Sequence, residues 1–185
     1  GYSLLLAWKS VGDDDFIVSM SDHVYDPSIP EKLVKEMGRA DVLIGVDSRP
    51  LYVDVSEATK VLVEDGRIVK MGKQLRHYTH VDVGVMGFSK GAPLKELKGK
   101  IELSKLVETT SSIGGDVLAV DVSGLPWIDL DTPEDIRRAE VEAREFIGEL
   151  IEGLWNYIRR FRTGDASEKP QPSSRRGRER FKACA

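Results

Sequence analysis

Apolar residues recur along this chain in two patterns, short runs typical of buried strands and helical repeats typical of amphipathic helices. The runs are rich in β-branched and aromatic residues and end at polar or glycine-containing stretches. Four segments of this kind predict strands: residues 16–20, 41–47, 77–88 and 116–122. We expect the first two to lie parallel and to form a βαβ unit with the helix between them.

A hairpin is predicted over residues 61–73. The segment alternates between apolar and polar residues on both sides of Asp65-Gly66, a dipeptide that favours a two-residue turn. Lys73 follows the second strand of this hairpin.

Helical spacing of apolar residues predicts the remaining elements. Short helices are expected over residues 1–10 and 30–38, and a third ends at Gly114-Gly115. From Pro133 to Ile158 the apolar residues keep helical spacing for many turns, which predicts one long helix that packs along the sheet. Strands and helices together indicate an α/β fold.

Composition is typical of a soluble globular protein with one core. The chain has 185 residues, 41% hydrophobic and 31% charged, and its wealth of Glu, Lys and Arg is a feature of thermophile proteins. A net charge of −4 gives no overall field for nucleic acid or an anionic membrane, so no nucleic-acid partner is expected. Cys184 is the single cysteine, which excludes an internal disulfide.

The two ends of the sequence carry their own predictions. The first residues lack a basic leader, and no apolar run approaches the roughly 20 residues of a membrane span, so we expect a cytoplasmic protein. Residues from 162 onward have no core-forming pattern and finish in a basic tail. The expected organisation is therefore a domain over residues 1–160 and a disordered tail over residues 161–185.

Carboxylates follow two of the apolar runs, where open α/β sheets bind ligands. Asp22 and His23 come just after residues 16–20. An aspartate at that place suits a divalent cation that neutralises phosphate oxygens. A turn acid ahead of the Asp26-Pro27 loop is the equally open alternative.

A second acidic stretch surrounds the start of the long helix. Thr132 as N-cap, Pro133 as the first helical residue and Asp135 three residues after the cap account for part of it. Asp129 lies on the strand side of this cap, where the helix gains nothing obvious from it. Asp129 is therefore the better candidate for a second metal ligand.

Asp82 lies in the middle of an apolar strand. A buried carboxylate needs a partner, and a cation or a ligand hydroxyl would serve. His77 and His80 are three residues apart and so lie on opposite faces of a strand, which makes a zinc site built on this pair improbable.

Three motifs in this order resemble the nucleotidyltransferase family that builds nucleotide-activated sugars and alcohols. They lie at residues 20–27, 81–85 and 127–135, and the resemblance covers roughly residues 1–140. The sequence is most similar to the CTP:inositol-1-phosphate cytidylyltransferase domain of archaeal and thermophile enzymes that make di-inositol phosphate solutes. The resemblance implies a Rossmann-like mixed sheet, mostly parallel and flanked by helices, as in nucleotide-diphospho-sugar transferases.

The resemblance also implies a reaction and a set of site residues. The reaction would be Mg²⁺-dependent transfer of a cytidylyl group from CTP to inositol 1-phosphate. Asp22 and Asp129 would hold the metal, and Lys73 would approach the acceptor phosphate. The residues expected to contact the substrates are Gly1 and Ser3 near the base, His23, and Asp82 with Gly84 in the acceptor pocket.

The Gly-rich loop that this family uses to bind the triphosphate has no counterpart here, because neither G-x-G-x-x-G nor G-x-x-x-x-G-K occurs. We therefore expect the carboxyl-terminal part of such a domain, which an amino-terminal fragment would complement. The related bifunctional enzymes continue into a membrane-embedded domain whose motif is absent from this sequence, so a membrane contact would require that further domain.

Three other functions remain open from the sequence. The nucleotide or the acceptor could be a different one, such as another sugar or alcohol phosphate. A GT-A-type glycosyltransferase would use a D-x-D metal site, which Asp129-Leu130-Asp131 spells. An inactive fragment of a nucleotidyltransferase domain is the third.

Overall fold

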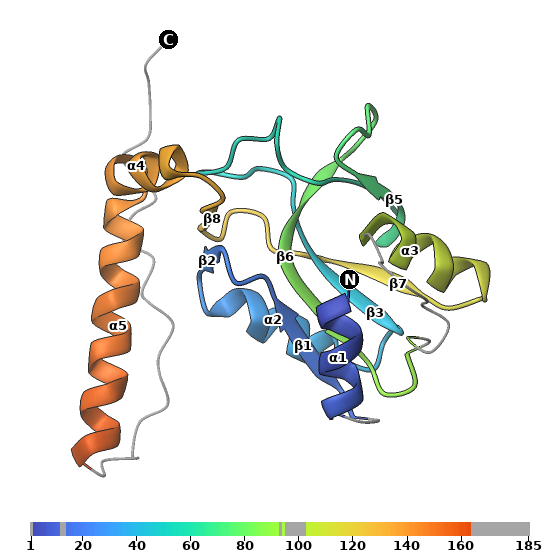
Figure 1. Cartoon of the computed structure of the whole chain (residues 1–185), viewed down its shortest axis with the longest axis horizontal. Coiled ribbons are helices and arrows are strands. Elements are labelled where there is room, and N and C mark those ends of the chain that lie inside the picture. Colours follow the sequence, from blue (N-terminus) through green and yellow to red (C-terminus); the bar gives the residue numbers. More distant parts are fainter. Residues whose placement is uncertain (1, 12–13, 93, 95–102, 164–185) are drawn as a thin grey trace. The chain divides into compact units, whose positions relative to one another are not determined.

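The computed structural model describes residues 2–11, 14–92, 94 and 103–163 (Figure 1). The strands are β1 (Phe16–Ser19), β2 (His23–Tyr25), β3 (Val42–Asp47), β4 (Lys60–Glu64), β5 (Arg67–Gly72), β6 (His80–Phe88), β7 (Val117–Asp121) and β8 (Trp127–Asp129). The helices are α1 (Tyr2–Val11), α2 (Ser28–Glu36), α3 (Leu103–Ser112), α4 (Pro133–Glu142) and α5 (Arg144–Thr163). The α/β class and the predicted strands at residues 16–20, 41–47 and 116–122 are confirmed.

Six strands form one sheet in the order β1-β6-β3-β7-β5-β4, and β4 also pairs with β6. Within these described strands, β3 with β7 is the parallel pair, and the others are antiparallel. The prediction of a mostly parallel sheet was therefore wrong. A continuous apolar run marks a strand buried on both faces, but it does not reveal the direction of the neighbouring strands.

The predicted βαβ unit is also corrected. β1 and β3 run in the same direction, because both lie antiparallel to β6. They are not neighbours, since β6 lies between them. The chain thus inserts its longest strand between two strands that are close in sequence, and this places the middle of β6 beside the end of β1.

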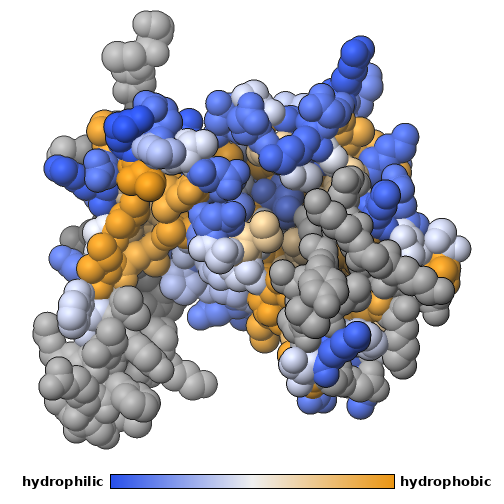
Figure 2. Space-filling view, viewed as in Figure 1, coloured by the Kyte–Doolittle hydropathy of each residue, from blue (hydrophilic) through white to orange (hydrophobic). Residues whose placement is uncertain are grey.

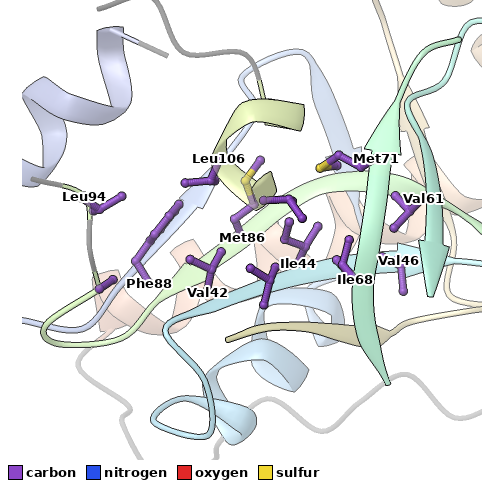
Figure 3. Close-up of a cluster of buried hydrophobic side chains, with 13 residues drawn as sticks. Val42, Ile44, Val46, Val61, Ile68, Met71, Met86, Phe88, Leu94 and Leu106 are labelled. Atoms are coloured by element: carbon purple, nitrogen blue, oxygen red, sulfur yellow. The ribbon is translucent and has the colours of Figure 1, made fainter. Parts of the chain in front are cut away.

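Side chains from the two faces of the sheet form two cores. Val42, Ile44 and Val46 of β3 point into a cluster that includes Leu106 of α3 (Figure 3). Leu43 points to the other face, where the α2 residues Ile29 and Leu33 complete a second cluster. The alternation along β3 follows from the two-residue period of a strand.

Local sequence signals are confirmed at two turns. Asp65 and Gly66 adopt φ values of 49° and 77°, and they connect β4 to β5 as the expected hairpin. Both residues of such a turn need positive φ, which Asp tolerates and Gly adopts readily. Gly114, with φ of 79°, follows the end of α3 at the predicted position.

The helix from Pro133 starts as predicted but does not continue as predicted. The Thr132 hydroxyl accepts from the Asp135 N–H, and the Asp135 carboxylate accepts from Thr132, which completes a capping box. Ala143 then departs from helical geometry at φ −106° and ψ 11°. One long helix was expected, whereas the structure has α4 and α5.

This break coincides with a division of the chain into two units, residues 1–144 and residues 145–185. The first unit contains both sheets and α1 to α4, and α5 provides the helix of the second. The predicted tail over residues 161–185 falls almost entirely outside the described residues. Among the residues that the structure describes, no helix is long and apolar enough to cross a membrane.

Candidate metal centre

A second, two-stranded sheet brings together the two acidic stretches of the sequence. β2 pairs antiparallel with β8, so that His23 lies opposite Asp129 and Tyr25 lies opposite Trp127. The ladder continues past the strand end, because the Leu130 N–H donates to the Asp22 carbonyl oxygen at 3.0 Å. The pairing places residues that are more than 100 positions apart side by side.

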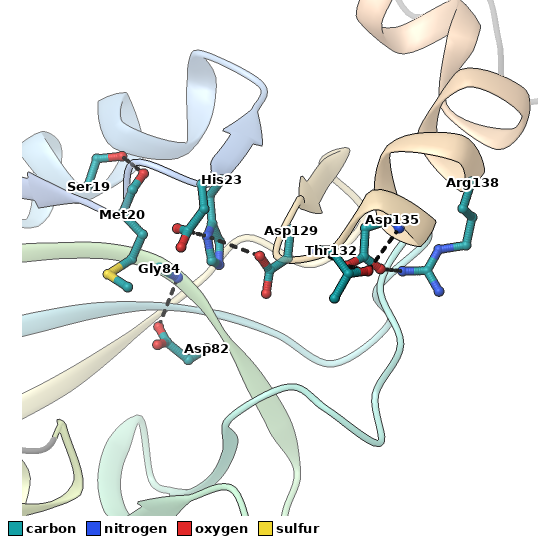
Figure 4. A network of polar contacts seen from close by, with 10 residues as sticks. Ser19, Met20, His23, Asp82, Gly84, Asp129, Thr132, Asp135 and Arg138 are labelled. Carbon is teal, nitrogen blue, oxygen red and sulfur yellow. Dashed lines mark hydrogen bonds and ion pairs between the residues drawn. The ribbon is translucent and has the colours of Figure 1, made fainter.

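Asp22, His23 and Asp129 form one cluster at the end of this ladder. His23 Nδ1 lies 2.9 Å from Asp22 Oδ1 and 3.8 Å from Asp129 Oδ1 (Figure 4). One ligand atom from each residue falls within 4.8 Å of the other two. These three side chains converge closely enough to share one cation.

The imidazole of His23 is held in place by an aromatic neighbour. The ring stacks on Trp127, with centroids 5.7 Å apart and planes inclined by 8°. The indole Nε1 of Trp127 in turn donates to Asp47 Oδ2 at 2.9 Å, in a fully buried position. Asp47 thus fixes the ring on which His23 rests.

Gly84 of β6 closes the opposite side of His23. Its φ of 74° lies in the left-handed region, and a Cβ at this position would come within 2.7 Å of His23 Cδ2. The Gly84 carbonyl oxygen also accepts from the Met20 N–H at 2.9 Å. Only glycine allows the backbone of β6 to approach the imidazole this closely.

Asp82 lies beside this glycine, and its carboxylate accepts from the Gly84 N–H at 3.0 Å (Figure 4). Although the side chain keeps partial access to solvent, burial raises the pKa of Asp82 to about 6. The Gly84 hydrogen bond and the nearby His23 oppose this rise. Asp82 therefore titrates closer to neutral pH than an ordinary aspartate does.

The two carboxylates of the cluster have opposite pKa shifts. The hydrogen bond from His23 lowers the pKa of Asp22. Burial raises the pKa of Asp129, and the negative charges of Asp131 and Asp22 raise it further while His23 opposes the rise. The surroundings of Asp129 therefore disfavour its charged form.

The donors of the cluster fit a divalent cation. Asp129 Oδ1 is buried and has no hydrogen-bond partner among the residues that the structure describes. Its 3.8 Å separation from His23 is too long for a hydrogen bond. Carboxylate oxygens are the ligands that Mg²⁺ prefers, and a cation would satisfy this oxygen.

The predicted site residues are brought together in part. Asp22, His23 and Asp129 form the cluster, and Gly84 and Asp82 adjoin it on β6. Lys73 is exposed in a turn directly after β5. Gly1 and the Ser3 side chain lie outside the described part of the structure. The functional roles assigned to all eight residues remain predictions.

Sequence reasoning missed the connection between Trp127 and Asp47. Asp47 ends an apolar run and is followed by Ser48-Arg49-Pro50, a pattern typical of a turn residue, and it does accept from the Arg49 N–H at 2.7 Å. Its second carboxylate oxygen holds Trp127 from 80 residues away. A buried tryptophan N–H needs an acceptor, which was a usable signal, but nothing in the sequence selects Asp47 from the other acids.

Known proteins resemble this chain in sequence. It is 39% identical over 144 residues to the "Bifunctional IPC transferase and DIPP synthase" of Rubrobacter xylanophilus, which covers 76% of this chain and 32% of that protein. The protein of the same name from Archaeoglobus fulgidus is 37% identical over 158 residues, covering 83% and 29%. The chain therefore spans about a third of the length of these curated relatives. No protein-family model matches it.

Solved structures resemble the chain as well. The inositol-1-phosphate CTP transferase from T. maritima is 30% identical, with a TM-score of 0.64 over 72% of this chain and 56% of that one. A putative glucose-1-phosphate thymidylyltransferase from Bacillus anthracis is 18% identical, with a TM-score of 0.60 over 77% and 60%. The second match supports the fold alone, whereas the first also shares sequence.

Proposed function

The chain belongs to the nucleotidyltransferase family, and on this premise we propose that it transfers a cytidylyl group from CTP to inositol 1-phosphate. The support comes from the inositol-1-phosphate CTP transferase among its structural relatives and from the acidic cluster on β2 and β8. The products are CDP-inositol and pyrophosphate.

The reaction requires positioning more than proton transfer. An oxygen of the inositol phosphate attacks the α-phosphorus of CTP and forms the new P–O bond. The bond to the β-phosphate breaks, and pyrophosphate leaves with its electron pair. The attacking oxygen is already anionic, so no general base is needed, and the main obstacle is the repulsion between two anions.

Asp22 and Asp129 are proposed to hold Mg²⁺, each through a carboxylate oxygen. When bound, the cation offsets negative charge on the phosphate groups. His23 holds the Asp22 carboxylate through its 2.9 Å hydrogen bond, and Trp127 keeps the imidazole in that orientation. These contacts preorganise the acidic pair before substrates arrive.

The remaining candidate residues surround this pair in the proposal. Asp82 and Gly84 border the acceptor pocket, and Lys73 adds a positive charge near the acceptor phosphate. Gly1 and Ser3 contact the base. Lys73 is exposed and so is free to extend toward a bound anion.

One observation carries the proposal, namely the buried Asp129 oxygen without a hydrogen-bond partner in the described structure. Leaving a buried polar group unsatisfied costs roughly 1–3 kcal/mol, so proteins rarely retain one without a purpose. A second carboxylate and an imidazole converge on the same point. A ligand of positive charge explains all three side chains together.

The direct test is pyrophosphate release by the purified 185-residue chain, supplied with CTP, inositol 1-phosphate and Mg²⁺. We expect release that requires all three, and roughly 100-fold or greater loss in Asp129→Asn, the size typical when one preorganised contact to a transition state is removed. Glu140→Gln is the matched control, because it removes the same charge from an exposed position of α4 and should leave the rate unchanged. Equal rates in Asp129→Asn and the parent chain would refute the proposed role of the cluster.

Substrate choice is tested with the same assay. UTP or GTP replaces CTP in one series, and glucose 1-phosphate replaces inositol 1-phosphate in another. We expect the CTP and inositol 1-phosphate pair to give the highest kcat/KM. A higher kcat/KM for another pair would support a nucleotidyltransferase that acts on different substrates. Calorimetric titration of CTP with and without Mg²⁺ separates a failure of binding from a failure of turnover.

A further inference from the structure

Helix α5 (Arg144–Thr163) exposes two large apolar side chains among the residues whose burial the structure describes. Ile151 and Trp155, one turn apart, are 50% and 61% exposed. Figure 2 shows a hydrophobic strip along the described part of this helix. Exposed apolar side chains one turn apart on a helix are suited to packing against another helix.

The apolar residues of α5 have the spacing found in a helix that packs against another helix. Within α5, apolar residues recur at intervals of three and four positions, at Ile147, Leu150, Leu154, Tyr157 and Phe161, and these residues are the apolar stripe. This is the a/d repeat of a coiled-coil seam, and Ile151 and Ile158 widen it on one side. The pattern extends from Ile147 to Phe161 of the 20-residue helix α5.

α5 also contains residues that weaken a helix standing alone. Gly148 and Gly153 lie in its interior, and a Cβ at either position would meet nothing within 4 Å. Each costs about 1 kcal/mol relative to alanine in a helix interior. Packing of the apolar stripe is therefore needed to stabilise this helix.

Charge is distributed along α5 in two blocks of opposite sign. Glu145, Glu149 and Glu152 are exposed in the first half, with Arg144 as its one basic residue. The second half contains Arg159, Arg160 and Arg162 and no acid. Two such helices side by side in antiparallel orientation would place each acidic half against a basic half.

We propose that α5 is a self-association surface that pairs antiparallel with α5 of a second copy of this chain. The apolar stripe supplies the buried seam, and the charge blocks select the antiparallel orientation, because a parallel pair would align like charges. A two-fold axis makes the contact self-complementary, so the pairing closes at a dimer. The glutamates of the first half disfavour an anionic lipid surface as the partner.

Sedimentation velocity of the full chain over a concentration series tests the pairing. We expect a monomer–dimer equilibrium, and a dissociation constant at least about tenfold higher in Ile151→Asp, since tenfold corresponds to 1.4 kcal/mol. Val141→Asp is the matched control, because Val141 is an apolar residue of α4 that is 80% exposed. The control should dimerise as the parent does.

Two results would overturn the proposal at this stage. One is a parent chain that stays monomeric across the series, as it would if the stripe packed within the chain. The other is an Ile151→Asp variant that dimerises unchanged while circular dichroism shows a folded protein. Equal weakening by Val141→Asp would assign the interface to a surface other than α5.

Charge exchange tests the basis of the pairing without touching the seam. Glu149→Lys with Glu152→Lys makes both halves basic, and Arg159→Glu with Arg162→Glu makes both halves acidic. We expect each double variant to dimerise more weakly, and an equimolar mixture of the two to form a mixed dimer. A mixture that associates no better than its components would contradict pairing by charge.

Orientation is read from cross-linking in a Cys184→Ser background. One preparation carries Glu145→Cys, and the other carries Thr163→Cys at the far end of α5. Antiparallel helices would join Cys at 145 of one copy to Cys at 163 of the other in a mixture of the two. Cross-links formed only within each preparation would show a parallel pair and overturn the orientation.

Discussion

Strand β3 is buried along all six of its residues, whereas every residue of β2 keeps partial exposure. Both strands belong to antiparallel ladders with partners distant in sequence. The β3–β6 ladder joins two apolar clusters, and the β2–β8 ladder ends in two carboxylates and an imidazole. One ladder buries apolar surface, while the other collects charge.

The difference indicates how stability and chemistry are divided in this molecule. Mutual repulsion makes closely spaced acids unfavourable, so a small ladder cannot hold Asp22 and Asp129 together unaided. It is anchored by Trp127 and Ile128, both fully buried or nearly so at 1% and 0% exposure. Changes in β3 and β6 should therefore alter folding, and changes at the polar end of β2 and β8 should alter ligand binding.

The largest expected effect on stability is in the apolar ladder. Ile44 is fully buried, so Ile44→Ala should lower the free energy of unfolding by about 2–5 kcal/mol. Urea denaturation measures this change, with Ile136→Ala on α4 as the control, since Ile136 is 50% exposed. A loss similar to that of the control would mean that the β3–β6 ladder does not dominate folding.

Gly84 lies on β6 and also contacts His23 of the acidic cluster, so it belongs to both regions. Its substitution should have the second-largest effect on stability. Gly84→Ala adds a Cβ at positive φ and within 2.7 Å of His23, and should lower the free energy of unfolding by roughly 2–4 kcal/mol. Gly124→Ala is the matched control, because Gly124 has φ of 82° but its nearest neighbour atom is 3.9 Å from the added Cβ. Only the first variant should also weaken Mn²⁺ binding followed by calorimetry. Equal costs and unchanged Mn²⁺ binding in both would show that the approach to His23 is unimportant.

Asp82 gives a smaller effect that depends on pH. Its pKa of about 6 in the folded protein is higher than the usual aspartate value, so folding favours the protonated form. The contribution of Asp82 to the free energy of unfolding is therefore greatest below about pH 4 and decreases as the pH rises toward about 6. Above that pH the contribution stays constant. Two pKa units correspond to at most about 3 kcal/mol, and partial solvent access reduces this to roughly 1–2 kcal/mol.

The measurement compares urea unfolding of the parent chain and Asp82→Asn between pH 4 and pH 7. The difference between the two isolates Asp82 from Asp22, whose lowered pKa acts in the opposite direction. We expect the parent to lose stability relative to the variant as the pH rises through this range. A difference that does not change with pH would show that Asp82 titrates normally.

The smallest effect on stability should come from Asp129. Asp129→Asn removes a carboxyl group whose pKa is raised by burial, so we expect a change in the free energy of unfolding of less than about 1 kcal/mol. Metal-dependent CTP binding should nevertheless disappear. A variant that unfolds instead would identify Asp129 as a structural residue and remove the contrast between the two ladders.

Local signals in the sequence predicted much of the fold. The Asp65-Gly66 turn, the Thr132 cap and the glycine after α3 depend on residues within about four positions, so sequence alone predicts them. Ala143 shows the limit of this reasoning. The apolar repeat continues through it, and neither Gly nor Pro marks the break between α4 and α5.

The sequence by itself determined the positions of the main strands, the caps and turns, and the two acidic stretches, because each depends on propensities and contacts along a short segment. Only the tertiary structure decided that β6 separates β1 from β3, that His23 faces Asp129, and that Asp47 holds Trp127. These pairings join residues 34 to 106 positions apart in the chain. Strand direction and register follow from how all the apolar faces are buried at once, which no single segment specifies.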